Sequence, residues 1–434
     1  MKFSLVANLL KKVTSGNKMH AVLLSDSAIT FLFKLISSII SFFLLAFITK
    51  SLGAELSGYY FLFIATLLFL NSISSLGMNN ILVKLIAVNF DSSKQSSIFL
   101  ILLRYILVSS FLVSVVLILY NFILSFGFFS GGAIGDYLAL LAIVLPAYSL
   151  KLFFSSYYQA KNKVFLSMLS FGLGYQTLLF LFLVAFEPAS VSDVLVLFVL
   201  SVYLILFFNF VNFLRDSNIV NVKQDFRETF SMSFPLLVSQ VVSQMSIFIV
   251  QFILAEYSSP TELSYFSVCQ RISILLSFLI IAINRVISPM FAKVCESENH
   301  AELQSLIVFS NRLLFIFSFP LFTFIVIFGE SILGLFGPQF VDAYPTLLVI
   351  LSAQFFASLI GTMNFLLQMS GYQKQFSLSV IYCSILSFFL AVFLIPNFGL
   401  SGAALTTFVS VTSVSLVSCF VVFKKLKVNP FKVY

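Results

Sequence analysis

Tryptophan is absent from this chain of 434 residues, and charged side chains account for only 9% of it. Soluble domains carry roughly 25% charged residues, so the composition excludes a molecule whose whole surface faces water. No polar stretch is long enough to fold as a separate soluble domain. The chain instead has 60% hydrophobic residues and a mean hydropathy of +1.09, which is typical of a protein embedded in a membrane.

Histidine and cysteine are also scarce, with two and four copies. His20 and His300 lie in polar segments, and the cysteines show neither pairing nor metal-binding spacing. We therefore expect no metal site, no cofactor and no catalytic residue. The net charge of +8 includes no basic run long enough for nucleic acid, so no nucleic-acid partner is expected.

Apolar runs of about twenty residues recur along the whole chain, and each can cross the hydrocarbon core as a helix. The predicted spans are 27–49, 57–88, 97–122, 135–157, 163–186, 190–214, 229–254, 262–292, 303–328, 343–366, 375–396 and 400–423. The sequence thus predicts an all-α integral membrane protein of about twelve transmembrane helices.

Lysine and arginine are distributed unevenly between the two sides of these spans. Of the 24 basic residues, all except Lys34, Lys50, Arg271 and Arg285 lie in the termini or toward the loops after even-numbered spans. Lys151 is assigned to that side as a topology anchor. Because basic loops stay in the cytoplasm, both termini are expected there.

The longest polar connection, 215–228, divides the chain into halves that resemble each other. Segments 55–60, 77–81 and 161–165 match 262–266, 282–286 and 372–376 at a nearly constant separation, which makes Ser57 equivalent to Ser264. Six spans are an even number, so both halves have the same orientation. We expect two pseudo-symmetric six-helix lobes around a central cleft.

The expected division of the chain has five parts. They are a cytoplasmic tail at 1–26, an N-lobe at 27–214, a linker at 215–228, a C-lobe at 229–423 and a second tail at 424–434.

Three cations, Lys34, Arg271 and Arg285, lie inside predicted spans, whereas all sixteen acids can be placed outside the hydrocarbon. A charge at membrane depth costs at least about 2.5–3.5 kcal/mol unless it faces water or a partner. Fourteen residues separate the two arginines, which places them on one helix face about 21 Å apart. These cations predict a positively charged cleft that binds an anion such as a phosphate.

Neutral polar residues at membrane depth supply further candidates for binding sugar hydroxyls. They are Asn79, Asn80, Asn284, Gln240 and Gln244. The alternative, that these amides only hold helices together, stays open.

Three segments carry a resemblance to a known family: 49–60 (TKSLGAELSGYY), 75–80 (SLGMNN) and 395–407 (IPNFGLSGAALTT). They resemble segments of Wzx-type polysaccharide and O-antigen flippases of the MOP superfamily, which have a MATE-like fold. The number of spans and the charged link after the sixth span are similar too.

The resemblance implies a flippase that moves undecaprenyl-pyrophosphate-linked oligosaccharide from the cytoplasmic to the outer leaflet by alternating access. Such a protein belongs in the bacterial plasma (inner) membrane and serves O-antigen, lipopolysaccharide, capsule or exopolysaccharide biosynthesis. A polysaccharide polymerase and a chain-length regulator are possible partners. Two alternatives remain: a MATE-type multidrug exporter, which usually needs a carboxylate within the membrane, and a membrane glycosyltransferase or O-antigen polymerase.

Overall fold

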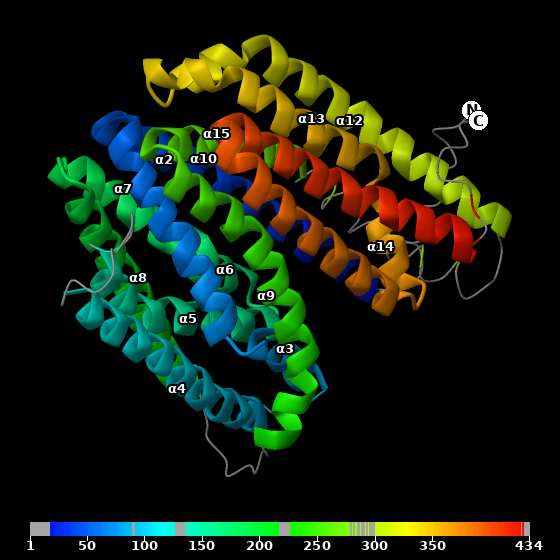
Figure 1. The fold of residues 1–434 in the computed structure, drawn as a ribbon. Helices are drawn as coiled ribbons and strands as arrows, with labels where there is room; N and C mark the ends of the chain where they lie inside the picture. The colour runs from blue at the N-terminus through cyan, green and yellow to red at the C-terminus, as the bar shows by residue number, and fades with distance from the viewer. Residues whose placement is uncertain are drawn as a thin grey trace.

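The computed structural model describes residues 18–88, 92–125, 137–216, 226–277, 300–426, Gly135, Val428 and isolated positions between 280 and 294. Every regular element within these residues is a helix. The predicted all-helical fold is therefore confirmed (Figure 1).

The first half of the chain holds the elements of the N-lobe. They are α2 (Lys18–Ser74), α3 (Met78–Val88), α4 (Ser92–Ser125), α5 (Leu138–Ala160), α6 (Val164–Met168), the π-helix η2 (Leu169–Leu173), α7 (Gly174–Phe186) and α8 (Val191–Asp216).

The second half holds the elements of the C-lobe. They are α9 (Phe226–Tyr257), α10 (Pro260–Ser273), α12 (His300–Gly334), the 3₁₀-helix η3 (Pro338–Ala343), α13 (Tyr344–Ile360), α14 (Thr362–Met369) and α15 (Gln373–Leu426).

Nine helical segments among the described residues are long and apolar enough to cross a membrane, and two of them contain more than one crossing. α2 is interrupted at Gly53 (φ 77°) and α15 at Gly399 (φ 53°), where the chain reverses between two predicted spans. The eighth predicted span begins with α10, and after a turn at Ile274 the described positions from Leu275 to Val294 are helical. These breaks reconcile the nine segments with about twelve predicted spans.

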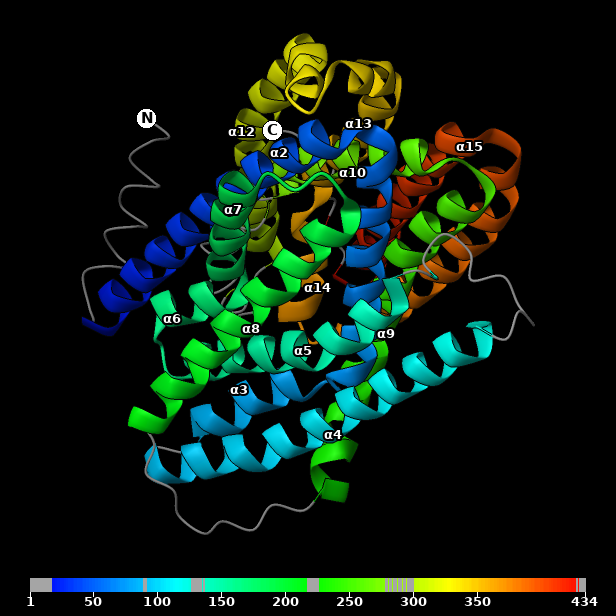
Figure 2. The same cartoon turned by 90° about the vertical axis from the view of Figure 1, so that its left-hand side faces the viewer.

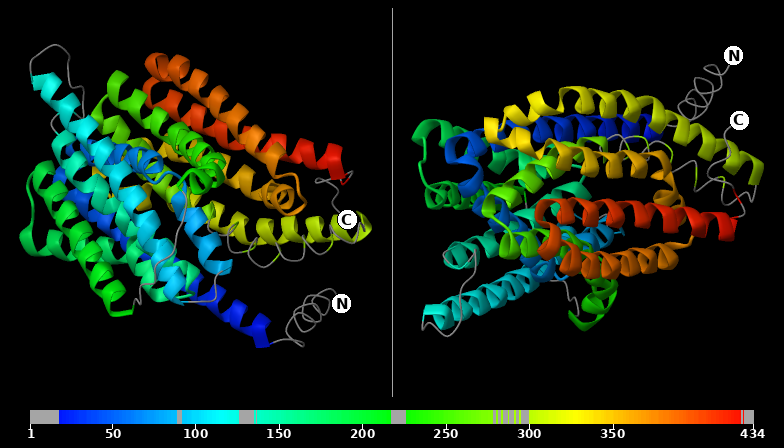
Figure 3. Two further views of the ribbon diagram at one scale, coloured as in Figure 1. Left: turned by 90° about the horizontal axis from the view of Figure 1, so that it is seen from below. Right: turned by 45° about the horizontal axis from the view of Figure 1, so that its top comes forward.

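The reversal at Gly399 brings the two halves of α15 into close antiparallel contact, and they lie side by side in Figures 1 and 3. A Cβ atom at Gly402 would lie 2.3 Å from the carbonyl oxygen of Leu394, so glycine permits this approach. The backbone N–H of Leu400 donates to Oε2 of Glu262 on α10 at 3.0 Å. A carboxylate in this position stabilises the start of a helix, which gives Glu262 a structural role.

The fifth predicted span is one crossing with a π-helix in its first half, which the sequence pattern did not predict. π-Helical turns widen an α-helix by one residue and are frequent at functional sites. Gly174 follows this turn, and a Cβ atom there would lie 2.7 Å from Cδ1 of Ile205. Glycine thus allows α7 to pack tightly on α8.

The buried apolar residues form one cluster shared by both lobes and two separate clusters. The shared cluster includes the part of α2 on both sides of Gly53, most of α10 and the centre of α15. One separate cluster, which includes Met78 and Phe99, joins α3, α4, α5 and α8, and the other, which includes Leu303 and Met363, lies in the C-lobe. The lobes are therefore packed together at the end of the bundle that holds Gly53 and the start of α10.

The two lobes are visible in perpendicular views. In Figure 1 the N-lobe helices α4, α5 and α8 lie apart from the C-lobe helices α12, α13 and α15. Figure 2 shows α3, α4 and α5 in neighbouring layers below α2, with α12 and α13 at the opposite side. α2 and α10, which pack against each other, lie between the lobes.

Gly77 marks a break between α2 and α3 that packs against α9. Its φ is +68°, and a Cβ atom there would lie 2.8 Å from the carbonyl oxygen of Ser233 and 2.9 Å from the backbone nitrogen of Leu237. We expect Gly77→Ala to reduce stability by about 2 kcal/mol, because the new methyl group meets backbone atoms at a left-handed position. Thermal unfolding in detergent measures the loss. Gly334→Ala is the control, since no atom lies within 4 Å there; equal melting temperatures for the two variants would contradict the prediction.

Candidate functional site

Arg271 lies in the last turn of α10, between the two lobes, and its side chain is exposed. Its Nη2 donates a hydrogen bond to Oγ of Ser41 on α2 at 3.0 Å. Among the described residues the guanidinium has this one hydrogen-bond partner and forms no ion pair. An exposed guanidinium with a single hydrogen bond keeps most of its donors for a ligand, and its planar fork suits a phosphate group.

The face of α10 that carries Arg271 is polar over two turns. Ser264, Ser267 and Arg271 follow at i, i+3 and i+7, which places them on one side of the helix. Oγ of Ser264 lies 2.7 Å from Oγ of Ser57 on α2. Oγ of Ser267 is buried and has no hydrogen-bond partner within the described part of the chain. This face of α10 therefore begins with a serine that contacts α2 and ends with an exposed guanidinium.

The facing side of α2 is also polar. Ser41 accepts from Arg271, and Ser37, one turn earlier, donates to Oε1 of Gln176 on α7 at 3.1 Å. Lys34 precedes Ser41 by seven residues, which places its backbone on the same helical stripe. The Lys34 side chain lies outside the described residues, so its predicted role in binding stays a prediction.

Three tyrosines of the N-lobe lie in the neighbourhood of Arg271. They are Tyr60, Tyr148 and Tyr175. The rings of Tyr148 on α5 and Tyr175 on α7 meet edge to face, with centroids 6.3 Å apart. The site therefore combines a C-lobe cation with N-lobe phenols, and phenols can donate hydrogen bonds to an anion.

Lys151 on α5 is a component of this region that sequence reasoning missed. The sequence assigns it as a topology anchor and does not predict its burial, but its side chain is 0% exposed. Its Nζ lies 4.5 Å from the ring centroid of Tyr148 and 4.3 Å from that of Tyr175. The Tyr148–Lys151 spacing of i, i+3 was the available signal, since such a pair meets on one helix face.

The predicted amides lie on other elements. Asn79 is half-buried on α3, with no hydrogen-bond partner for its buried Oδ1 among the described residues, and Asn80 beside it is exposed. Gln240 and Gln244 are half-buried on α9. In the described structure no hydrogen bond joins these four side chains to Arg271. Asn284 and Arg285 lie outside the described residues, so their predicted roles also stay predictions.

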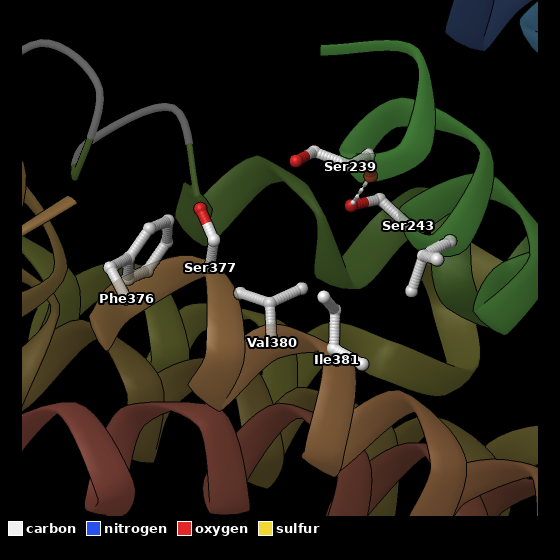
Figure 4. Close-up of a pocket in the computed structure, with 7 residues that line it drawn as sticks. Ser239, Ser243, Phe376, Ser377, Val380 and Ile381 are labelled. Carbon is white, nitrogen blue, oxygen red and sulfur yellow. Dashed lines mark hydrogen bonds between the residues drawn. The ribbon is translucent and has the colours of Figure 1, made fainter. Parts of the chain in front are cut away.

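A cavity of about 70 Å³ lies between α9 and α15. Figure 4 shows Ser239 and Ser243 of α9 facing Phe376, Ser377, Val380 and Ile381 of α15. The Ser243 hydroxyl donates to the carbonyl oxygen of Ser239 at 2.8 Å. Its lining contains no cation, so it does not suit an anion.

A second cavity, of about 320 Å³, lies between the end of the first crossing and the loop after α7. Its lining includes Phe47, Ser51 and Glu187. The single charged group in that lining is a carboxylate, which repels anions. Of these places, the region around Arg271 suits an anion best.

A family model described as polysaccharide biosynthesis protein matches residues 23–295. No curated protein sequence matches the chain.

Several solved membrane transporters share the fold. The lipid II flippase MurJ, in an inward closed conformation, has a TM-score of 0.72 and 15% identity over 91% of this chain and 87% of that one. An inward-facing multidrug resistance MATE family transporter of the MOP superfamily has a TM-score of 0.72 and 13% identity over 90% and 94%. A MOP superfamily transporter from Pyrococcus furiosus, described by a reverse polarity of its binding pocket, has a TM-score of 0.62 and 12% identity over 93% and 95%.

Proposed function

The chain belongs to the polysaccharide biosynthesis protein family, and from that premise we propose that it carries a polyprenyl-diphosphate-linked oligosaccharide across the bilayer. Its multi-pass helical fold is that of MurJ and MATE transporters. The family and these structural neighbours are flippases and transporters. The undecaprenyl carrier, the cytoplasmic-to-outer direction and a role in O-antigen, capsule or exopolysaccharide synthesis are parts of the proposal.

The exposed guanidinium of Arg271 is the observation that carries the proposal. Among the described residues it faces no carboxylate, and its one hydrogen bond goes to a serine of the opposite lobe. A cation within a membrane-spanning segment is costly without an anionic partner, so an anionic ligand stabilises this arrangement. A diphosphate between a lipid tail and a sugar chain supplies that anion.

The packing of the lobes supports a transport cycle by alternating access. The lobes share an apolar cluster at one end and have separate clusters elsewhere. The charge distribution predicts that the shared end is the outer one. In this state the substrate enters from the cytoplasmic side, and rocking of the lobes then exposes it to the outer leaflet.

The proposal also assigns roles to the other binding residues predicted from the sequence. Lys34 and Arg285 add positive charge along the path, while Asn79, Asn80, Asn284, Gln240 and Gln244 bind sugar hydroxyls. A polysaccharide polymerase and a chain-length regulator receive the product on the outer side. The proposed membrane is the bacterial inner membrane, with both termini in the cytoplasm.

A translocation assay tests this function. The full chain is reconstituted into liposomes with a fluorescent undecaprenyl-diphosphate-linked oligosaccharide, and a membrane-impermeant reagent reports which leaflet holds the label. We expect the protein to move label between leaflets, whereas protein-free vesicles do not. Export of a cationic dye without lipid movement would contradict the proposal and favour the multidrug exporter. Sugar polymerisation by the purified protein would instead favour the polymerase.

A further inference from the structure

Lys151 lies in an environment that is unusual for an ammonium group. Its side chain is 0% exposed, and Nζ donates to the carbonyl oxygen of Phe171 at 2.8 Å. The rings of Tyr148 and Tyr175 lie 4.5 and 4.3 Å from Nζ. Within the described structure it forms no ion pair with a carboxylate. The group is therefore held by one carbonyl and two aromatic rings.

Fold stability does not explain this lysine. Replacing buried charged groups by apolar residues of similar volume is often neutral or stabilising. The hydrogen bond to Phe171, which lies in the π-helix η2, requires a donor but not a positive charge. Fold stability alone thus does not account for an ionisable group at this position.

The two tyrosines connect Lys151 to the candidate site. Lys151 contacts the rings of Tyr148 and Tyr175, and the guanidinium of Arg271 interacts electrostatically with the phenols of the same two residues. One cation belongs to the N-lobe and the other to the C-lobe. Lys151 and Arg271 therefore approach the same two tyrosines from different lobes.

We infer that Lys151 is the second cation of the anion site and gives it a preference for a diphosphate over a monophosphate. This inference rests on the proposed function. Lys151 is a positioning residue, because it acts through Tyr148 and Tyr175 rather than touching the ligand. Its field strengthens the phenols as donors, and a buried charge is little screened by salt. The gain in ligand affinity from this charge is about tenfold for each additional negative charge on the ligand at roughly 10 Å from Nζ.

The test compares three probes that share one lipid tail: undecaprenyl diphosphate, undecaprenyl monophosphate and uncharged undecaprenol. Binding to the full chain in nanodiscs is measured for the wild type and for Lys151→Met. We expect the wild type to prefer the diphosphate, and Lys151→Met to lower the diphosphate-to-monophosphate affinity ratio about tenfold. Binding of undecaprenol stays unchanged.

Two further variants separate charge from structure. Lys151→Gln keeps a donor for the Phe171 carbonyl oxygen but removes the charge, so it is expected to lower the affinity ratio as Lys151→Met does. It replaces Lys151→Met in the test if the methionine variant fails to fold. Ser155 lies on α5, the helix that carries Lys151, and its hydroxyl donates to the Ser167 carbonyl oxygen at 2.8 Å. Ser155→Ala removes this hydrogen bond without changing the charge, so it is expected to leave the ratio unchanged. An unaltered ratio in folded Lys151→Met or Lys151→Gln overturns the inference. Equal wild-type binding of all three probes overturns the proposed function itself.

Discussion

Substitution of Arg271 by alanine is expected to abolish translocation of a diphosphate-linked lipid. The variant loses the exposed guanidinium between the lobes and its hydrogen bond to Ser41. Hydrogen bonds to charged groups contribute about 1.5–3 kcal/mol each, and a phosphate engages a guanidinium through two of them. Affinity for undecaprenyl diphosphate should therefore fall by about 100-fold. The measurements are the liposome translocation rate and lipid binding in nanodiscs.

Lysine at the same position distinguishes charge from geometry. Arg271→Lys keeps a positive charge but loses the bidentate fork, so we expect an intermediate loss of about tenfold in affinity. Arg104→Ala is the matched control, because it removes an exposed arginine from α4, outside the Arg271–Ser41 hydrogen bond. Normal membrane insertion is confirmed for each variant. Unchanged translocation by inserted Arg271→Ala would refute the role of Arg271, although family membership would stand.

Arg271 could be predicted from sequence because the reason for its importance is local. A charge in an apolar run is costly wherever the helix packs, and no acid occurs at similar depth in the chain. The spans could be predicted for the same reason, since hydropathy and length decide them. The reversals at Gly53 and Gly399 fall between predicted spans, as expected.

Lys151 could not be predicted because its surroundings come from another helix. Its sequence neighbours and its closeness to Lys161 favour a boundary position, but Tyr175 and the Phe171 carbonyl enclose it from the fifth crossing. The π-helix that presents this carbonyl has no periodicity signal in the sequence. Burial of an ammonium by distant residues is a tertiary effect, and local patterns do not encode it.

The internal repeat illustrates the same limit in a different way. Sequence matching made Ser57 equivalent to Ser264, but it did not indicate that the two residues touch. Their hydroxyl oxygens lie 2.7 Å apart. Two equivalent positions can touch only near the axis that relates the repeats, so this contact lies where α2 and α10 cross between the lobes. A Cβ atom at Gly58, the next residue, would lie 2.0 Å from the carbonyl oxygen of Pro260, which shows how closely the helices approach.

This contact allows a direct test of lobe movement. In the double variant Ser57→Cys/Ser264→Cys, the two sulfur atoms replace oxygens 2.7 Å apart, which is compatible with disulfide formation. We expect oxidation to cross-link the lobes and to reduce translocation to the level of protein-free vesicles, because alternating access requires the lobes to separate at this end. Reduction of the disulfide should restore transport.

A disulfide within one lobe provides the control. Oγ of Ser74 on α2 lies 2.8 Å from Oγ of Ser149 on α5, so Ser74→Cys/Ser149→Cys should cross-link with similar efficiency. Both residues belong to the N-lobe and move together, and transport should therefore survive oxidation. The native Cys269, Cys383 and Cys419 are buried. Variants that carry only one of the two introduced cysteines reveal any disulfide formed with these native thiols. If the oxidised Ser57→Cys/Ser264→Cys protein still translocates at the reduced rate, the lobes do not separate at this contact, and the path must open elsewhere.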